Sequence, residues 1–243
     1  MQEMTLQRLL TKLKRRSRLA PEDEAALLAL PFTVRTLEPG NYLVRQGERA
    51  DFTCVLMDGF AYRQKIVGDG GRQIVALQVP GDAVDLQNSL LKIADHSVQA
   101  LGPVTMARIP RAALLELAAT YPAIAHAFWL DTLVDGSIAW EWIANIGRRK
   151  ALMRLAHLLC ECAVRLEVVG FQPGEAKMLP MTREQIGDAL GLTTVHVSRM
   201  LKQLESEGLI ARRNRTVAIL DSEQLRLVAD FQSAYLHLNL VED

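Results

Sequence analysis

The alternation of apolar and polar positions is most informative between residues 182 and 220, where it predicts two short helices followed by a hairpin. Thr182 and Gln185 have the spacing of a capping box, which marks the start of the first helix. Gly191 is placed as its C-terminal stop. The apolar residues between them share one helical face: Ile186, Ala189 and Leu190.

The second helix is expected to begin after the cap residue Thr193 and to stop at Gly208. Three apolar residues at helical spacing form its inward face: Val197, Leu201 and Leu204. Another face carries four side chains suited to base edges in the major groove: Val195, Ser198, Arg199 and Lys202. An arginine pairs with guanine there, and an apolar group contacts a thymine methyl. The pattern is typical of the recognition helix of a helix-turn-helix.

The segment after Gly208 predicts a wing, with short strands at Leu209 to Ile210 and Thr216 to Leu220 around a basic tip suited to phosphates. The side chains expected at DNA come from both helices and this wing: Arg183, Thr193, Thr194, Val195, Ser198, Arg199, Lys202, Arg212, Arg213 and Arg215. The whole chain balances 28 Lys and Arg against 28 Asp and Glu, so net charge gives no indication of nucleic acid. The local cluster of basic residues does, with an amphipathic helix pair that contacts no DNA as the alternative.

The front half of the chain, from Phe32 to Ile109, has β-branched and aromatic runs separated by regular turn residues. The runs that we expect as strands are Asn41 to Arg45, Thr53 to Met57, Phe60 to Val67, Gln73 to Gln78 and Val104 to Ile109. Short strands without long helices between them predict a jelly-roll β-barrel. With the helical C-terminal half, the fold class is α+β.

This barrel lacks the residues of a catalytic or metal centre. His96 is the only histidine before residue 126, whereas a metalloenzyme barrel needs several converging ligands. No serine-hydrolase elbow, phosphate loop or paired cysteine motif occurs, so we expect no enzyme and no metal site. His96 is expected to make ordinary hydrogen bonds, with ligand contact as the alternative.

The segment from Ala123 to Asn145 predicts a long helix that is apolar on more than one face. One stripe comprises Ile124, Phe128, Val134, Ile138 and Trp142, and four more large residues lie off it: Trp129, Leu130, Leu133 and Trp140. One side can rest on the barrel, and the other then needs a second chain. We therefore expect a homodimer, with burial inside one subunit as the alternative. Gly147 and the following Arg148-Arg149-Lys150 are expected to break the helix as a hinge before a new helix from Ala151 to Leu166.

A length of 243 residues favours two domains. No stretch approaches the roughly 20 apolar residues of a membrane span, and Thr5 to Leu19 is amphipathic, so a cytoplasmic protein is expected. Cys54, Cys160 and Cys162 suit neither a disulfide framework nor a metal site and are expected as buried reduced thiols, with a redox sensor as the alternative.

The chain resembles the Crp/Fnr family of bacterial transcription regulators over essentially its full length. The segments that carry the resemblance are Gly40, residues 43–48 (LVRQGE) with Asp51, Asp58-Gly59, Pro80-Gly81-Asp82, residues 182–187 (TREQIG) and Val197-Ser198-Arg199. The resemblance implies a homodimer that binds an inverted repeat in double-stranded operator DNA. It also adds RNA polymerase as a candidate partner, through an exposed loop expected at Val168 to Met178.

The chain departs from the cyclic-nucleotide-binding members of this family. Asp85-Leu86 stands where they have the Gly-Glu that holds the ribose, and Asp95-His96-Ser97 stands where an arginine receives the phosphate. A carboxylate in place of a guanidinium removes most of the phosphate anchoring, so control by cyclic AMP is not expected. An unidentified effector would meet a different set: Asp85, Leu86, Gln87, His96 and Ser97. The N-terminal cysteines of the oxygen-sensing branch are missing, so no iron-sulfur cluster is expected.

The expected organisation is a barrel domain at residues 1–121, a dimerisation helix and hinge at 122–147, and a DNA-binding domain at 148–243. Two alternatives remain beside an effector-controlled regulator. One is a constitutive DNA-binding dimer whose barrel is only a scaffold, and the other is a barrel enzyme with a DNA-binding appendage.

Overall fold

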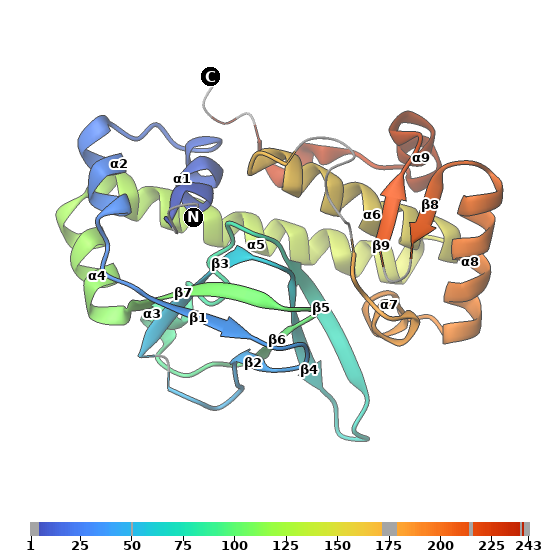
Figure 1. The fold of residues 1–243 in the computed structure, drawn as a ribbon, viewed down its shortest axis with the longest axis horizontal. Coiled ribbons are helices and arrows are strands. Elements are labelled where there is room, and N and C mark those ends of the chain that lie inside the picture. Colours follow the sequence, from blue (N-terminus) through green and yellow to red (C-terminus); the bar gives the residue numbers. More distant parts are fainter. Residues whose placement is uncertain (1–4, 50, 172–178, 214–215, 239, 241–243) are drawn as a thin grey trace.

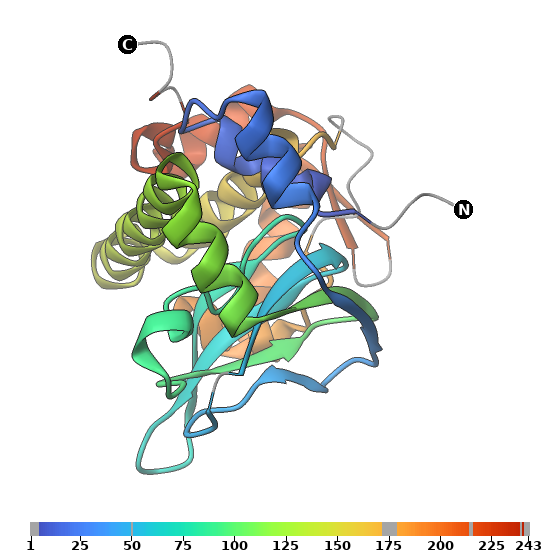
Figure 2. The same cartoon turned by 90° about the vertical axis from the view of Figure 1, so that its left-hand side faces the viewer.

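A computed structural model describes residues 5–49, 51–171, 179–213, 216–238 and 240. The chain forms an N-terminal barrel capped by helices, one long helix that runs along the molecule, and a C-terminal helical domain (Figure 1). Figure 2 shows the N-terminal helices above one end of the barrel. The architecture confirms the expected α+β class with a jelly-roll, a long helix and a winged helix-turn-helix.

Two antiparallel sheets make up the barrel. One has the strand order β1-β7-β3, formed by β1 (Thr33–Leu37), β7 (Val104–Pro110) and β3 (Phe52–Asp58). The other has the order β2-β6-β4-β5, formed by β2 (Tyr42–Val44), β6 (Ser97–Ala100), β4 (Ala61–Ile66) and β5 (Arg72–Gln78). β1 and β6 were not among the strands expected from the sequence. A buried apolar core that includes Leu56, Val98 and Met106 lies between the sheets.

Four helices cover one end of the barrel: α1 (Gln7–Lys14), α2 (Pro21–Leu28), α3 (Asn88–Leu91) and α4 (Arg111–Thr120). Leu9, Leu10 and Leu13 of α1 are buried in a second core with Ile109 of the barrel and Ile124 of the long helix. The N-terminal segment is thus an integral part of the barrel domain, because its apolar face is covered by residues from distant parts of the chain.

The long helix α5 spans Pro122–Arg148 and carries a buried and an exposed stripe. The predicted inward stripe, which includes Ile124, Val134 and Trp142, is buried. The break expected at Gly147 and the following Arg148-Arg149-Lys150 is confirmed at the last two of these residues. The helix continues through Gly147 to Arg148, so Gly147 itself does not end it, and the extended residues Arg149 and Lys150 form the break. Among the described residues no single helix is long and apolar enough to cross a membrane; α4 and α5 pass that test only as a pair bent by 118°.

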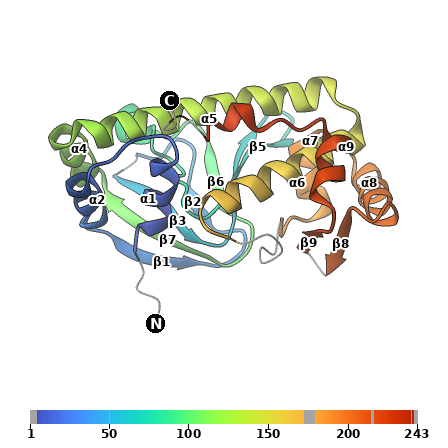
Figure 3. The same ribbon diagram turned by 90° about the horizontal axis from the view of Figure 1, so that it is seen from above.

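The C-terminal domain begins with α6 (Ala151–Val168), which packs against the recognition-helix side of the domain and its last helix (Figure 3). The remaining elements are α7 (Arg183–Leu190), α8 (Thr194–Ser206), β8 (Ile210–Arg213), β9 (Thr216–Ile219), α9 (Ser222–Ala229) and the 3₁₀ helix η1 (Ser233–Leu236). The loop expected from Val168 differs at its start, because Val168 ends α6 and is buried. Residues 172–178 of that loop lie outside the described residues.

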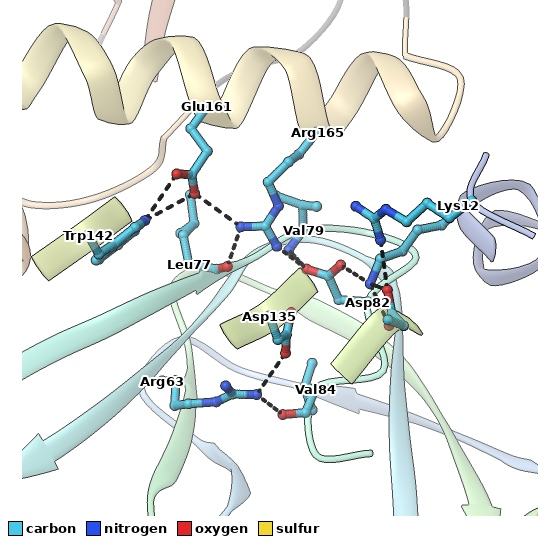
Figure 4. Close-up of polar contacts among 12 residues, drawn as sticks. Lys12, Arg63, Leu77, Val79, Asp82, Val84, Asp135, Trp142, Glu161 and Arg165 are labelled. Atoms are coloured by element: carbon cyan, nitrogen blue, oxygen red, sulfur yellow. Dashed lines mark hydrogen bonds and ion pairs between the residues drawn. The ribbon is translucent and has the colours of Figure 1, made fainter. Parts of the chain in front are cut away.

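A buried network of charged side chains joins the barrel, α1, α5 and α6 (Figure 4). Nη2 of Arg165 lies 2.6 Å from Oδ2 of Asp82, and Nζ of Lys12 lies 3.0 Å from Oδ1 of the same carboxylate. On the α6 side, Glu161 accepts hydrogen bonds from Nε1 of Trp142 and from the hydroxyl of Tyr235. The C-terminal domain is therefore fastened to the barrel by ion pairs as well as by apolar packing.

Candidate nucleic-acid interface

The first helix of the helix-turn-helix begins and ends as its local sequence predicts. The Thr182 hydroxyl accepts from the Gln185 backbone N–H at 3.1 Å, and the Gln185 side chain accepts from the Thr182 N–H at 2.8 Å. Gly191 ends α7 with φ of +64°, a conformation that glycine adopts without strain. Ile186, Ala189 and Leu190 are buried, as expected.

The second helix, α8, is also capped by the predicted residue. The Thr193 hydroxyl accepts from the His196 backbone N–H at 3.3 Å, and Gly208 follows the helix with φ of +73°. The inward stripe of Val197, Leu201 and Leu204 is buried against the rest of the domain. Burial of this face fixes the rotation of α8 about its own axis, and the opposite face is left to solvent.

The side chains predicted to contact bases lie close together on that opposite face of α8. Six residues line one open surface depression of about 420 Å³: Arg183, Thr194, Val195, Ser198, Arg199 and Lys202. Val195 is 66% exposed although it is apolar, so the fold leaves a hydrophobic group facing outward here. Among the described side chains, none forms an ion pair with Arg199 or Lys202, and both cations face solvent.

Two further exposed residues, Thr193 and His196, lie at the start of α8. Thr193 is exposed, but its hydroxyl is engaged at the helix cap. His196 is exposed beside it, with Nδ1 3.2 Å from the Thr193 hydroxyl, and was not among the residues that we expected at DNA. Its position in the first turn of α8 was the available signal, since that turn enters the major groove in helix-turn-helix proteins.

The wing differs from expectation at Arg212. The hairpin forms, but Arg212 and Arg213 lie within β8 and not at the tip. The Arg212 guanidinium holds Glu205 of α8, with Nη2 2.6 Å and Nε 3.0 Å from Oε2. This hydrogen-bonded contact lowers the pKa of Glu205. The paired Arg212 therefore joins wing to helix instead of presenting a free cation. Asn214 and Arg215 lie outside the described residues.

The residues expected at an effector are dispersed. Asp85 is buried and accepts from the Cys54 backbone N–H at 2.8 Å. Leu86 and Gln87 line a groove of about 480 Å³ between α3, α4 and α5. The Ser97 hydroxyl accepts from the Gln46 backbone N–H at 3.0 Å. Among the described residues, that groove is lined by Leu86 and Gln87 of this set and not by Asp85, His96 or Ser97.

His96 is buried, and its Nδ1 lies 2.5 Å from Oδ1 of the exposed Asp95. Burial lowers the pKa of His96, so the imidazole is neutral at pH 7. Its Nε2 is buried and has no hydrogen-bond partner among the described residues. Leu86 belongs to the apolar core of the barrel end, where it cannot hydrogen-bond a ribose.

The three cysteines are buried and form no disulfide, which confirms the expectation of buried reduced thiols. Cys160 and Cys162 lie on α6 inside the C-terminal core. Burial raises the pKa of each of these two thiols to about 12, so both are protonated and unreactive at neutral pH. Burial likewise raises the pKa of Cys54.

Comparison with known proteins places this geometry in a family. The family model of the Crp-like helix-turn-helix domain matches residues 153–228, and that of the cyclic nucleotide-binding domain matches residues 34–121. The nitrogen fixation regulation protein FixK of Azorhizobium caulinodans is 32% identical over 178 residues, which cover 73% of this chain and 71% of that protein. The transcriptional activator protein FnrL of Cereibacter sphaeroides is 29% identical over 207 residues, 84% of this chain and 83% of that protein.

A solved structure shows the same arrangement. FixK2 from Bradyrhizobium japonicum superimposes with a TM-score of 0.71 at 27% identity, covering 82% of this chain and 98% of that one. FixK is a nitrogen fixation regulation protein, and FnrL is a transcriptional activator protein. The capped helix-turn-helix, the barrel and these likenesses together show that the chain belongs to the Crp/Fnr family of bacterial transcription regulators.

Proposed function

We propose that this Crp/Fnr regulator binds an inverted repeat in operator DNA as a homodimer, with one α8 in the major groove of each half-site. The single observation that carries the proposal is the outward face of α8, where Val195, Arg199 and Lys202 line one open surface with Arg183. In this role Arg199 pairs with guanine, and Val195 contacts a thymine methyl. Arg183, Thr194, Ser198 and the basic residues of the wing other than Arg212 contact phosphates or flanking bases.

The dimer is supported by the exposed stripe of α5. Its large apolar residues are Trp129, Leu133, Trp140 and Ile143, which are 66%, 53%, 72% and 69% exposed. Together with Gly136 they follow a spacing of four and three residues, which is the seam of a two-stranded coiled coil. A Cβ atom at Gly136 would meet no atom within 4 Å, so two helices can approach closely there. A soluble monomer rarely exposes so continuous an apolar stripe.

Control by cyclic AMP is not part of the proposal. A bound phosphate would meet the Asp95 carboxylate and the neutral His96. Nζ of Lys65 lies 3.9 Å from Oδ2 of Asp95, which offsets the negative charge without providing a bidentate anchor. Membership of the family also leads us to propose RNA polymerase as a partner. On the same ground we propose a cytoplasmic role without enzymatic activity.

A constitutive dimer with a scaffolding barrel is the second candidate. The observation that favours it is that Asp85, Leu86 and Ser97 are already engaged in hydrogen bonds or core packing within the fold. A ligand that changes DNA affinity must bind two arrangements of the protein differently. Screening metabolites for a change in operator affinity separates the two candidates.

Selection from random DNA tests the proposal. The purified full chain is expected to enrich an inverted repeat whose half-site centres are about one helical turn apart, roughly 10 base pairs. The complex should contain two chains per duplex by light scattering. Enrichment of no sequence, or of a single unrepeated site by a monomer, contradicts the proposed function.

A further inference from the structure

The barrel touches the helix-turn-helix directly, at a contact between β5 and α7. Nε and Nη2 of Arg72 lie 2.7 Å and 2.6 Å from Oδ2 of Asp188, and Nε2 of Gln73 donates to the Asp188 backbone carbonyl at 2.7 Å. Nη2 of Arg72 also lies 3.6 Å from Glu184, one turn earlier on α7. Figure 1 shows α7 beside the barrel hairpin that ends in β5. The side chains of Arg72 and Asp188 are only about a quarter exposed, at 26% and 24%.

Apolar packing and an aromatic ring hold Arg72 in place. Tyr62, Ile74 and Leu77 of the barrel share one buried core with Ile186 and Leu190 of α7. The guanidinium carbon of Arg72 lies 5.8 Å from the centre of the Tyr62 ring, and Nη1 donates to the Tyr62 hydroxyl at 3.4 Å. A side chain that is stacked and hydrogen-bonded loses little further freedom when it binds a carboxylate, so its contact with Asp188 is pre-organised.

The other end of α7 is tied to the hinge. Nη1 of Arg154 donates to the Leu190 carbonyl in the last turn of α7 at 2.9 Å, and Nε donates to the Arg149 carbonyl at 2.8 Å. Arg149 directly follows α5, which ends at Arg148, and is its C-terminal cap residue. The first helix of the helix-turn-helix is therefore fixed between the barrel hairpin and the end of α5, by residues that do not line the outward surface of α8.

We propose that Arg72 is a positioning residue for DNA recognition, which sets the placement of α7, and with it α8, relative to the barrel. This role rests on the proposed function, because it matters only when two helix-turn-helix units must reach two half-sites at once. Fixed placement gives the dimer a sharp preference for one half-site separation, and loss of the contact lets each unit search a wider volume. The barrel thereby influences DNA binding along a path that does not pass through α5.

The test uses the operator selected by the wild-type chain, in versions whose spacer is one or two base pairs shorter or longer, and a duplex with one half-site. Arg72→Ala and Asp188→Ala are each expected to weaken binding to the optimal spacing about threefold to tenfold, and to flatten the dependence on spacing. Their affinity for the single half-site should stay unchanged. Because the two single variants remove the same ion pair, the variant that carries both substitutions should weaken binding no more than either substitution alone.

Two further variants distinguish positioning from a general loss of structure. Lys65→Ala is the matched control, since Lys65 lies on the same barrel hairpin but approaches Asp95 and not α7, and it should bind like wild type. The exchanged pair Arg72→Glu with Asp188→Arg is expected to recover the steep spacing dependence. Recovery would not follow if either residue acted only through the stability of its own domain.

Three outcomes are decisive. An unchanged spacing profile in Arg72→Ala, or an equal loss of affinity for every duplex including the single half-site, overturns the positioning role while the proposed function stands. A wild-type chain that selects no inverted repeat contradicts the proposed function and removes this role with it. A flattened profile in both single variants, restored by the exchanged pair, supports the role.

Discussion

Arg165 of α6 donates to Asp82 of the barrel, with 2.6 Å between Nη2 and Oδ2, and both side chains are more than nine-tenths buried. Burial opposes ionisation of Asp82, but Lys12 and Arg165 outweigh it and lower the pKa of this carboxyl to about 2. The Leu77 carbonyl accepts a second donor of the same guanidinium at 3.0 Å. The C-terminal domain thus meets the barrel through a charge pair that is completed only when both are folded.

We expect Arg165→Met to lower the free energy of unfolding by about 3–5 kcal/mol. The substitution leaves Glu161 buried without its cationic partner, and it leaves Asp82 with Lys12 but without Arg165. Urea denaturation at fixed protein concentration measures this change. Lys14→Ala is the control, since it removes an ion pair with Glu24 in which the lysine side chain is 46% exposed. The control should cost less than about 1 kcal/mol. A similar decrease in the free energy of unfolding in the two variants would contradict the larger contribution of the buried pair.

Stability should depend on pH through Asp85. Burial raises the pKa of Asp85 to about 7, against an ordinary value of 3.8, although the Cys54 backbone N–H opposes the shift. Between these values the folded chain binds a proton that the unfolded chain has released, so this group lowers stability as pH rises from about 4 to about 7. Below and above that window its contribution is constant.

Asp85→Asn should therefore stabilise the protein at pH 8 by roughly 2–4 kcal/mol relative to its effect at pH 4, because the amide oxygen still accepts from Cys54 and never ionises. Denaturation at a series of pH values measures the difference. Asp58→Asn, at a side chain that is 73% exposed, provides the control. A difference between Asp85→Asn and wild type that does not change with pH would contradict this account.

Trp140→Glu should convert the dimer to a monomer at micromolar concentration, because a charge within the α5 stripe is buried without a partner on association. Analytical ultracentrifugation reports the change. Leu227→Glu is the matched control: Leu227 lies on α9 and is 72% exposed, as Trp140 is. A dimer that survives Trp140→Glu would place the interface elsewhere.

Cyclic AMP should neither bind at micromolar concentration nor raise operator affinity, since Asp95 and the neutral His96 stand at the sequence position where cyclic-nucleotide-binding members have the phosphate-binding arginine. Calorimetry and operator binding with and without the nucleotide test this expectation. Saturable binding accompanied by tighter operator binding would restore the nucleotide switch. His96→Arg, which places a cation among these residues, is the variant to compare.

Elements specified by neighbouring residues were predictable from the sequence, and contacts between distant residues were not. The caps Thr182 and Thr193 were predicted because a capping hydrogen bond spans only three residues. β1 was missed because it is exposed along most of its length and has no apolar alternation. The pairing of Arg72 with Asp188 spans 116 residues, so no local pattern could indicate it.

The error at Arg212 has a similar origin. A basic run after a glycine predicts a phosphate-binding tip, but the register of β8 and β9 pairs Arg212 with Val217 and directs its side chain to Glu205. Strand register depends on where the hairpin turns, and the sequence analysis assigned all four residues 212–215 to the tip instead of beginning the turn after Arg213. The reading face of α8 was predictable because helical periodicity alone separates it from the buried stripe.

Parallel selection from random DNA with the wild-type chain and Arg199→Ala tests the central claim most directly. The wild-type chain should enrich an inverted repeat with a guanine at one position of each half-site. Arg199→Ala should keep the repeat, lose preference at that position alone, and bind the wild-type operator more weakly by roughly 1–3 kcal/mol. An Arg199→Ala variant that retains full preference at every position would contradict the assignment of α8 as the recognition helix.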